Sequence, residues 1–240
     1  MDIDYVVISA DDSHYLDLYE PVAATWKKLG FKTIMLHITD ENSLTETEYG
    51  IYRRIKKHYS YPTSWQAQLV RLYAYEMFPE YNLLLSDIDM APLSKGYFNK
   101  NASLISNSQI LSYSGQPYSD VPYYPMCYIL GAGNVMKDVL ELPETFEEFL
   151  SQVEQSHTVK WNSDEHYLYD RLKSYSDLVT LPVRKYKLDR IDRGNWVYDP
   201  KKVAEEKYID THVLRPYKQY KTDIDSLLSY VAHNPPTPSR

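Results

Sequence analysis

Apolar and polar positions in residues 1–38 alternate in a way that predicts a strand, a helix and a second strand. Residues 5–9 are an apolar run, which predicts a first strand followed by an acidic turn at residues 10–12. Apolar residues then recur at helical spacing to Leu29, in a pattern that Pro21 either kinks or restarts near Glu20. Gly30 is expected to end this helix before a strand at residues 32–38. The three elements predict a βαβ unit with parallel strands and a right-handed crossover.

Residues 39–90 contain one clear helix and one clear strand. Residues 39–49 are polar and predict a loop, whereas residues 51–59 fit either a short strand or a short helix. The segment Thr63-Ser64-Trp65-Gln66 has the pattern of a capping box, so we expect a helix from there to about Phe78. The leucines at 83–85 predict a buried strand that surfaces at its carboxyl end.

The pattern loosens beyond residue 90. Short strands are predicted at 103–106, 109–113 and 177–181, and residues 128–133 predict a strand that runs into a glycine turn. Thr145-Phe146-Glu147-Glu148 is a second capping box, and further helices are predicted at 163–175 and around 223–232, after a late strand at 208–215. We therefore expect an α/β fold with a Rossmann-type half at 1–90 built on a central, mostly parallel sheet, and a mixed half at 91–232, together one domain. Residues 233–240 are proline-rich and are expected to be a disordered tail or a linker to a further domain.

Composition narrows the class of protein. The net charge of -7 argues against a nucleic-acid partner, although Arg184, Lys185, Lys187, Arg190 and Arg193 could face a small anion or form a solvated surface. Cys127 is the one cysteine, so no intrachain disulfide can form, and it has no catalytic pattern around it. The acidic N-terminus does not resemble a signal peptide, and no apolar run is long enough to form a transmembrane segment. We expect a cytoplasmic protein.

The strongest chemical signal is the run Leu83-Leu84-Leu85-Ser86-Asp87-Ile88-Asp89. Side chains alternate along an extended strand, so Asp87 and Asp89 are expected to point the same way. Two carboxylates together are costly unless something positive lies between them. A divalent cation that carries a phosphate group, Mn²⁺ or Mg²⁺, is the expected partner.

This organisation resembles the GT-A glycosyltransferases, the nucleotide-sugar-dependent transferases with an Asp-x-Asp motif, over most of residues 3–217. The resemblance implies a GT-A-like fold with an acceptor-binding second half. It implies that Ser9, Ala10 and Asp11 meet the nucleotide base. It also implies that Asp89 binds the metal directly, while Asp87 serves the ribose or the metal shell.

The segment around His212 looks like the late histidine motif by which several GT-A families complete the metal shell. Here the motif lacks the glycine and the lysine before proline of better-known patterns. Neutral imidazole suits Mn²⁺, and Arg215 could then pair with the donor diphosphate. The alternative is an ordinary structural histidine.

Three further groups are candidates in similar transferases. Gln68 and Arg71 would border the donor pocket, or else form a solvated helix face. Trp161, Asp164 and Glu165 would face the acceptor, with a carboxylate as general base if the reaction inverts the anomeric carbon; helix capping alone also favours acids there. Gly131 would let the backbone approach the sugar, or simply form a turn.

The predicted function is therefore metal-dependent transfer of a sugar from a nucleoside diphosphate sugar, with UDP chosen on frequency, to a hydroxyl acceptor such as a glycan. The metal would act as a Lewis acid on the departing diphosphate. The alternatives are a HAD-type phosphohydrolase, in which Asp-x-Asp usually lies on the first strand, a nucleotidyltransferase, or an inactive sugar-nucleotide-binding or interaction module. Retention or inversion stays open.

Overall fold

The structure is a computed structural model and describes residues 1–114, 123–182 and 189–231. The strands are β1 (Tyr5–Asp11), β2 (Lys32–Thr39), β3 (Ser43–Thr47), β4 (Gly50–Lys56), β5 (Asn82–Leu85), β6 (Met90–Pro92), β7 (Ile110–Ser112), β8 (Ile129–Ala132), β9 (Leu178–Thr180), β10 (Arg190–Ile191) and β11 (Asp210–His212). The helices are α1 (Tyr19–Lys28), preceded by a 3₁₀ turn at Leu16–Leu18, α2 (Thr63–Met77), α3 (Lys95–Ala102), α4 (Gly133–Val139), α5 (Phe146–Ser156), α6 (Ser163–Leu172), α8 (Pro200–Ala204) and α9 (Tyr217–Ser229).

A large mixed sheet has the strand order β3-β4-β2-β1-β5-β8-β7-β9. The stretch β4-β2-β1-β5 is parallel, and the predicted βαβ unit is confirmed by the parallel pairing of β1 with β2. Beyond β5 the sheet is mixed, because β5 with β8 and β8 with β7 pair antiparallel whereas β7 with β9 pairs parallel. A small sheet, β10-β11-β6, joins segments of both halves.

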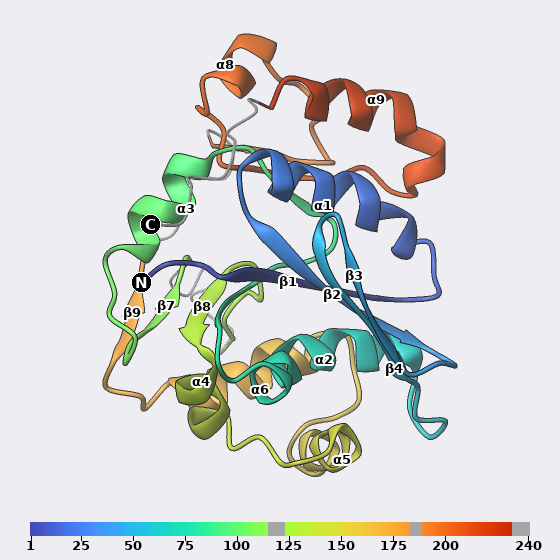
Figure 1. Cartoon of the computed structure of the whole chain (residues 1–240), viewed down its shortest axis with the longest axis vertical. Coiled ribbons are helices and arrows are strands. Elements are labelled where there is room, and N and C mark those ends of the chain that lie inside the picture. The colour runs from blue at the N-terminus through green and yellow to red at the C-terminus, as the bar shows by residue number, and fades with distance from the viewer. Residues whose placement is uncertain (115–122, 183–188, 232–240) are drawn as a thin grey trace.

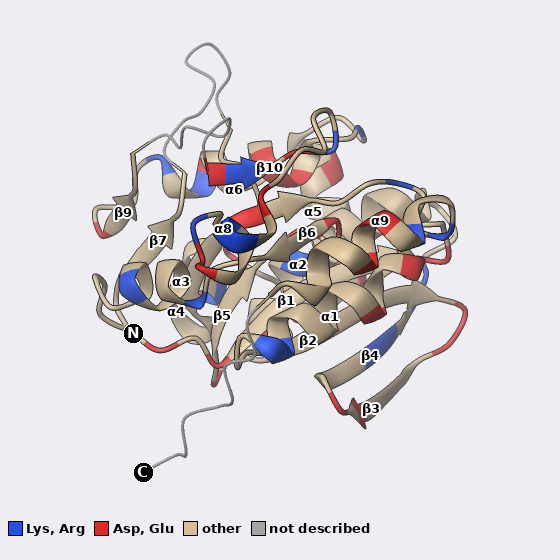
Figure 2. Ribbon diagram, turned by 90° about the horizontal axis from the view of Figure 1, so that it is seen from above, with Lys and Arg blue, Asp and Glu red and all other residues tan. Residues whose placement is uncertain are grey.

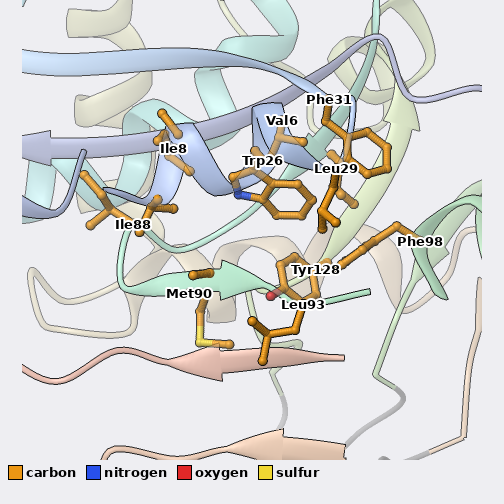
Figure 3. Packing of buried hydrophobic residues seen from close by; sticks show 14 of the residues in the cluster. Val6, Ile8, Trp26, Leu29, Phe31, Ile88, Met90, Leu93, Phe98 and Tyr128 are labelled. Atoms are coloured by element: carbon orange, nitrogen blue, oxygen red, sulfur yellow. The ribbon is translucent and has the colours of Figure 1, made fainter. Parts of the chain in front are cut away.

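Helices cover both faces of the large sheet (Figure 1). Helices α1, α8 and α9 lie on one side, and α2, α4, α5 and α6 lie on the other. On the α1 side, Trp26 packs edge-on against Phe98 with 4.9 Å between ring centroids, and Met90 and Leu93 of the β6 segment complete this core (Figure 3). Positive and negative residues alternate along the ribbon, and neither sign covers a whole side of the view in Figure 2.

Three predicted elements differ from the structure in the middle of the chain. Residues 39–49 are not all loop, because β3 forms there and pairs antiparallel with β4, which settles residues 50–56 as a strand. Residues 103–106 are not a strand: they follow the unpredicted helix α3 as turns, and Leu104 is 59% exposed. Residues 128–133 do not end in a glycine turn, since β8 leads directly into α4 at Gly133.

The two predicted capping boxes have different outcomes. At Thr145 the box is present, because its side chain accepts from Glu148 N and the Glu148 carboxylate accepts from Thr145 N. At the start of α2 it is absent. Thr63 donates instead to Asp11, and the Gln66 amide donates to the carbonyl of His58. Tertiary contacts therefore replace the local cap of α2.

Both predicted ends of the first helix are confirmed. Helix α1 begins at Tyr19, which confirms a fresh start near Glu20, and Gly30 has the positive φ of 85° that suits glycine after a helix.

The predicted anion-facing residues Arg184, Lys185 and Lys187, and the predicted tail at 233–240, lie outside the described residues. In the part of the chain that the structure describes, no helix has the length and apolarity needed to span a membrane.

Candidate functional site

A cavity of about 750 Å³ lies at the edge of the large sheet where β1 and β5 end. Because these strands are parallel, their carboxyl ends meet at one edge, which is where open α/β sheets bind ligands. Residues from α2, from the start of α6, from the segments 123–127 and 190–193, and from β11 and the residues after it also line the cavity. The cavity brings together the sequence-selected residues Ser9, Ala10, Asp11, Gln68, Arg71, Asp87, Asp89, Trp161, Asp164, Glu165, His212 and Arg215.

Asp87 and Asp89 do not lie in a strand as predicted. Strand β5 ends at Leu85, where Ser86 N still donates to Val7 O, and the chain then turns through a hydrogen bond from Met90 N to Asp87 O at 3.1 Å. Both carboxylates nevertheless line the cavity, because the turn carries them past the end of the sheet. Their convergence comes from this turn rather than from strand alternation.

Arg71 organises the floor of the cavity. It projects from α2, is 7% exposed, and donates to Asp87 and to Asp164 Oδ2, the latter at 3.0 Å. Burial alone would lower the pKa of Arg71, but the charges of Asp87 and Asp164 raise it above its ordinary value. One guanidinium thus joins the turn after β5 to the first turn of α6, and the predicted alternative of a solvated helix face is wrong for this residue.

Asp89 lies beside two guanidinium groups and one imidazole of this same chain. Its Oδ2 lies 3.1 Å from Arg193 Nη1, 3.2 Å from His212 Nε2 and 3.4 Å from Arg215 Nη1. Burial favours the neutral acid, but the hydrogen bond and charge of His212, with Arg193 and Arg71, hold the pKa of Asp89 below its usual range. The pKa of Asp89 therefore favours the ionised carboxylate.

The small sheet explains how His212 reaches Asp89. Strand β11 pairs antiparallel with β6 so that His212 lies opposite Met90, and Val213 N donates to Asp89 O at 2.9 Å. The next turn of chain brings the Arg215 guanidinium to 4.7 Å from the centroid of the Tyr15 ring. Backbone pairing thus fixes the side chains around Asp89.

The acidic pair at the start of α6 lies in a buried, negatively charged setting. Asp164 uses Oδ2 for Arg71 and Oδ1 for the backbone N–H of Glu165 at 2.9 Å. Burial raises the pKa of Asp164, with Arg71 opposing. Burial, together with the charges of Asp164 and Asp87, raises the pKa of Glu165 to about 8.

The end of β1 is fixed to the start of α2. Asp11 accepts hydrogen bonds from Thr63 Oγ1 at 2.8 Å and from Ser13 N at 3.2 Å. Burial raises the pKa of Asp11, but the hydrogen bonds from Ser13 and Thr63 outweigh it and the pKa lies below the ordinary value. Ser9 Oγ donates to Ala67 O at 2.5 Å, so this hydroxyl is already used within the fold.

Gly131 is the sequence-selected residue that the cavity does not include. It lies inside β8, and a Cβ there would approach Met136 Cγ to 2.5 Å and Ile110 beyond it. The close approach that this glycine permits is therefore between β8 and α4, not between the backbone and a sugar. Trp161, by contrast, lines the cavity while remaining 70% exposed.

Sequence reasoning missed several lining residues. Asp192 lies 3.5 Å from His212 Nδ1, and His14, Tyr15 and Tyr123 also contribute. Position after the carboxyl end of the first strand was the available signal for His14 and Tyr15. Arg193 belongs to the basic segment that the sequence suggested could face an anion.

The donor set around Asp89 suits a divalent ion that takes further ligands from a substrate. Two ligand atoms at right angles, each about 2.1 Å from an octahedral ion, are about 3 Å apart. In this structure Asp89 Oδ2 and His212 Nε2 are 3.2 Å apart and share a hydrogen bond, so an ion held by both atoms would replace that bond. Among the described residues no group of three or more His, Cys, Asp or Glu side chains forms a complete metal site. Mg²⁺-type sites commonly combine one or two carboxylates with substrate phosphates.

Comparison with known proteins supports the fold. No protein-family model matches the sequence, and no curated protein sequence matches it. The structure is similar to that of the glycosyltransferase GlyE of Streptococcus pneumoniae TIGR4, with a TM-score of 0.52 and 12% identity, covering 100% of this chain and 66% of that one. The present chain thus spans slightly less than two thirds of that protein's length. A glycosyltransferase involved in glycosylation of the major capsid of PBCV-1 has a TM-score of 0.43 and 13% identity, over 87% of this chain and 93% of that chain.

At these identities the likeness to GlyE shows a glycosyltransferase-like α/β fold with a large central sheet. Substrates and metal have to be argued from the residues of this chain.

Proposed function

We propose that this protein is a metal-dependent glycosyltransferase that moves a sugar from a nucleoside diphosphate sugar to a hydroxyl acceptor. The observation that carries the proposal is the setting of Asp89: an ionised carboxylate beside His212, Arg193 and Arg215, at the ligand-binding edge of a glycosyltransferase-like sheet. Opposite charges gathered in this way suit a cation together with a diphosphate.

In this proposal Asp89 and His212 hold Mn²⁺ or Mg²⁺. When bound, the ion supplies Lewis-acid stabilisation of the negative charge on the departing diphosphate. The guanidinium groups of Arg193 and Arg215 lie beside Asp89 and share that task, because planar donors pair well with phosphate oxygens. Arg71 donates to Oδ1 of Asp87 and so fixes the turn. In this proposal the other oxygen of Asp87 serves the ribose or a metal-bound water.

The base end of the donor would lie at Ser9, Ala10 and Asp11. These residues line the cavity at the carboxyl end of β1. The Ser9 hydroxyl is occupied by Ala67 O, and both oxygens of Asp11 accept hydrogen bonds from Ser13 and Thr63, so recognition there would rely on backbone groups. UDP is the first nucleotide to test.

Glu165 is better suited than Asp164 to contact the acceptor. Both acids line the cavity, but both oxygens of Asp164 have partners within the protein, whereas Glu165 has a backbone hydrogen bond with Met126. When it is ionised, Glu165 can take a proton from an attacking hydroxyl, the role that an inverting reaction requires, and with a pKa of about 8 the ionised fraction grows as the pH rises above neutral. The exposed ring of Trp161 offers an aromatic face for an acceptor sugar.

The experiment is a donor-hydrolysis and transfer assay over a panel of nucleotide sugars, with and without Mn²⁺. We expect turnover to require the metal and to fall at least about a hundredfold in Asp89→Ala, comparable to the loss of an oxyanion-stabilising group. Asp138→Ala, an exposed acid on α4, is the matched control and should keep full activity. Metal-independent turnover that survives Asp89→Ala would contradict the proposal, and metal-dependent binding without turnover would favour the non-catalytic alternative.

A further inference from the structure

Gln68 lines the cavity with an unsatisfied polar atom. The side chain is 8% exposed, and its buried Oε1 has no hydrogen-bond partner among the described residues. Gln66, two residues earlier on α2, is also buried, yet its amide accepts from His58 N and donates to two backbone carbonyls. A buried carbonyl oxygen without a donor is unfavourable, so a ligand that supplies an O–H or N–H there gains affinity.

The position of Gln68 on α2 indicates which part of a donor it meets. Ser64, Gln68 and Arg71 follow one another along one face of the helix at spacings of four and three, and all line the cavity. Ser64 is one residue from Thr63, which binds Asp11, and Arg71 binds Asp87 and Asp164. Gln68 therefore lies between the base end of the cavity and the carboxylates near the acceptor side.

The groups around that position are mostly hydrogen-bond acceptors. Asp87 and Asp164 line the same cavity, and Arg71 already donates to both of them. Oxygen acceptors of this kind match sugar hydroxyls, which donate. A carboxylate on the ligand would instead face like charges in a poorly solvated setting.

We propose that this part of the cavity selects a neutral, hydroxyl-bearing sugar, with Oε1 of Gln68 accepting a hydrogen bond from one hydroxyl of the transferred group, and that it rejects sugars carrying a carboxylate. The inference rests on the proposed function and names its donor class. Selection of this kind is strong because the analogue without the hydroxyl leaves the buried oxygen unpaired.

The test compares matched donors on the wild-type protein with Mn²⁺ present: UDP-glucose against UDP-glucuronate, and GDP-mannose against GDP-mannuronate. One of the two nucleotides is expected to bind. For that nucleotide, we expect calorimetry to give the neutral donor a dissociation constant at least tenfold lower than that of its uronate. Monodeoxy forms of that donor should identify one hydroxyl whose loss weakens binding about tenfold. Equal or tighter binding of the uronate, or no such hydroxyl, would overturn the inference.

Two variants link the effect to Gln68. Gln68→Met keeps the shape and removes the acceptor, so it should weaken the neutral donor about tenfold while leaving the free nucleoside diphosphate unchanged. Gln68→Glu keeps an acceptor, so it should bind the neutral donor and discriminate more strongly against the uronate. Gln155→Met, an exposed position on α5, is the matched control.

The outcomes separate the two proposals. If neither UDP nor GDP binds with Mn²⁺, the proposed function fails and this inference fails with it. If a nucleoside diphosphate binds but Gln68→Met weakens it as much as the sugar donor, only the inference is overturned.

Discussion

Arg71 is the single residue on which the shape of the cavity floor depends most. Its guanidinium is buried and joins Asp87, Asp164 and the carbonyl of Ser86, which come from two different elements. Removing one member of a buried ion pair leaves a charge without a partner, which costs more than the pair itself contributes.

Arg71→Met is therefore expected to destabilise the fold by about 3 kcal/mol or more, because it strands Asp164. Arg71→Lys should lower the free energy of unfolding by less, because the ammonium group keeps a positive charge beside Asp87 and Asp164. It should still be destabilising, because lysine lacks the planar guanidinium that donates to both carboxylates. Chemical denaturation of both variants measures this. Arg53→Met on β4, outside the cavity, is the control, and an equal loss there would contradict the assignment.

Glu165 gives a pH-dependent prediction. Its pKa is about 8 in the folded chain and near 4.5 when unperturbed, so between these values the folded state binds a proton that the unfolded state lacks. This group makes stability fall as pH rises from about 4.5 to about 8. Glu165→Gln does not titrate, so its stability relative to wild type should rise over that window by a few kcal/mol. Parallel stability curves for the two proteins in thermal melts from pH 5 to 8.5 would contradict the pKa.

At the scale of elements, short strands determine where individual side chains of the site lie. The pairing of β11 with β6 carries His212 to Asp89, and the direct passage from β8 into α4 determines what Gly131 does. Both effects come from packing between elements that are distant or irregular in the sequence.

Gly131→Ala tests the corrected role of that glycine. Because a Cβ would press on Met136 inside the core, we expect a loss of about 1–3 kcal/mol in unfolding free energy. Donor affinity should not change, since the residue does not line the cavity. A raised KM for the donor at unchanged stability would restore the original prediction that this backbone approaches the sugar.

At the scale of the whole molecule, the cavity joins the two halves of the chain. The β1 and β5 ends come from residues before 90, whereas Glu165, Arg193 and His212 come from the second half. A ligand that spans the cavity therefore bridges both halves and stabilises the folded state as a unit.

Mn²⁺ and a nucleoside diphosphate are expected to stabilise the protein synergistically. Asp89 and His212 supply only part of a metal shell, and the diphosphate would supply further oxygens. A nucleoside diphosphate at about 100 times the dissociation constant that it has with Mn²⁺ present should add about 2.7 kcal/mol. The same concentration without Mn²⁺ should add less, so the two ligands together should stabilise by more than the sum of their separate effects. The shift in melting temperature is measured with Mn²⁺ alone, with the nucleoside diphosphate alone, with both, and with both plus EDTA. If the two separate shifts simply add up to the shift with both ligands, a shared metal site is contradicted.

The sequence by itself determined the βαβ start and the buried leucine strand, and with the resemblance to GT-A glycosyltransferases it selected twelve of the residues that line the cavity. Hydrophobic periodicity is a local property, and carboxyl ends of parallel strands meet at one edge whatever the details of packing. Ser9, Asp11 and Asp87 could therefore be placed together from the pattern alone.

Only the tertiary structure decided how those residues are partnered. The turn after β5, the contact between His212 and Asp89 across 123 positions, the burial of Gln68 and the core role of Gly131 depend on contacts between distant segments. Such contacts are set by packing and strand register, which local spacing does not encode.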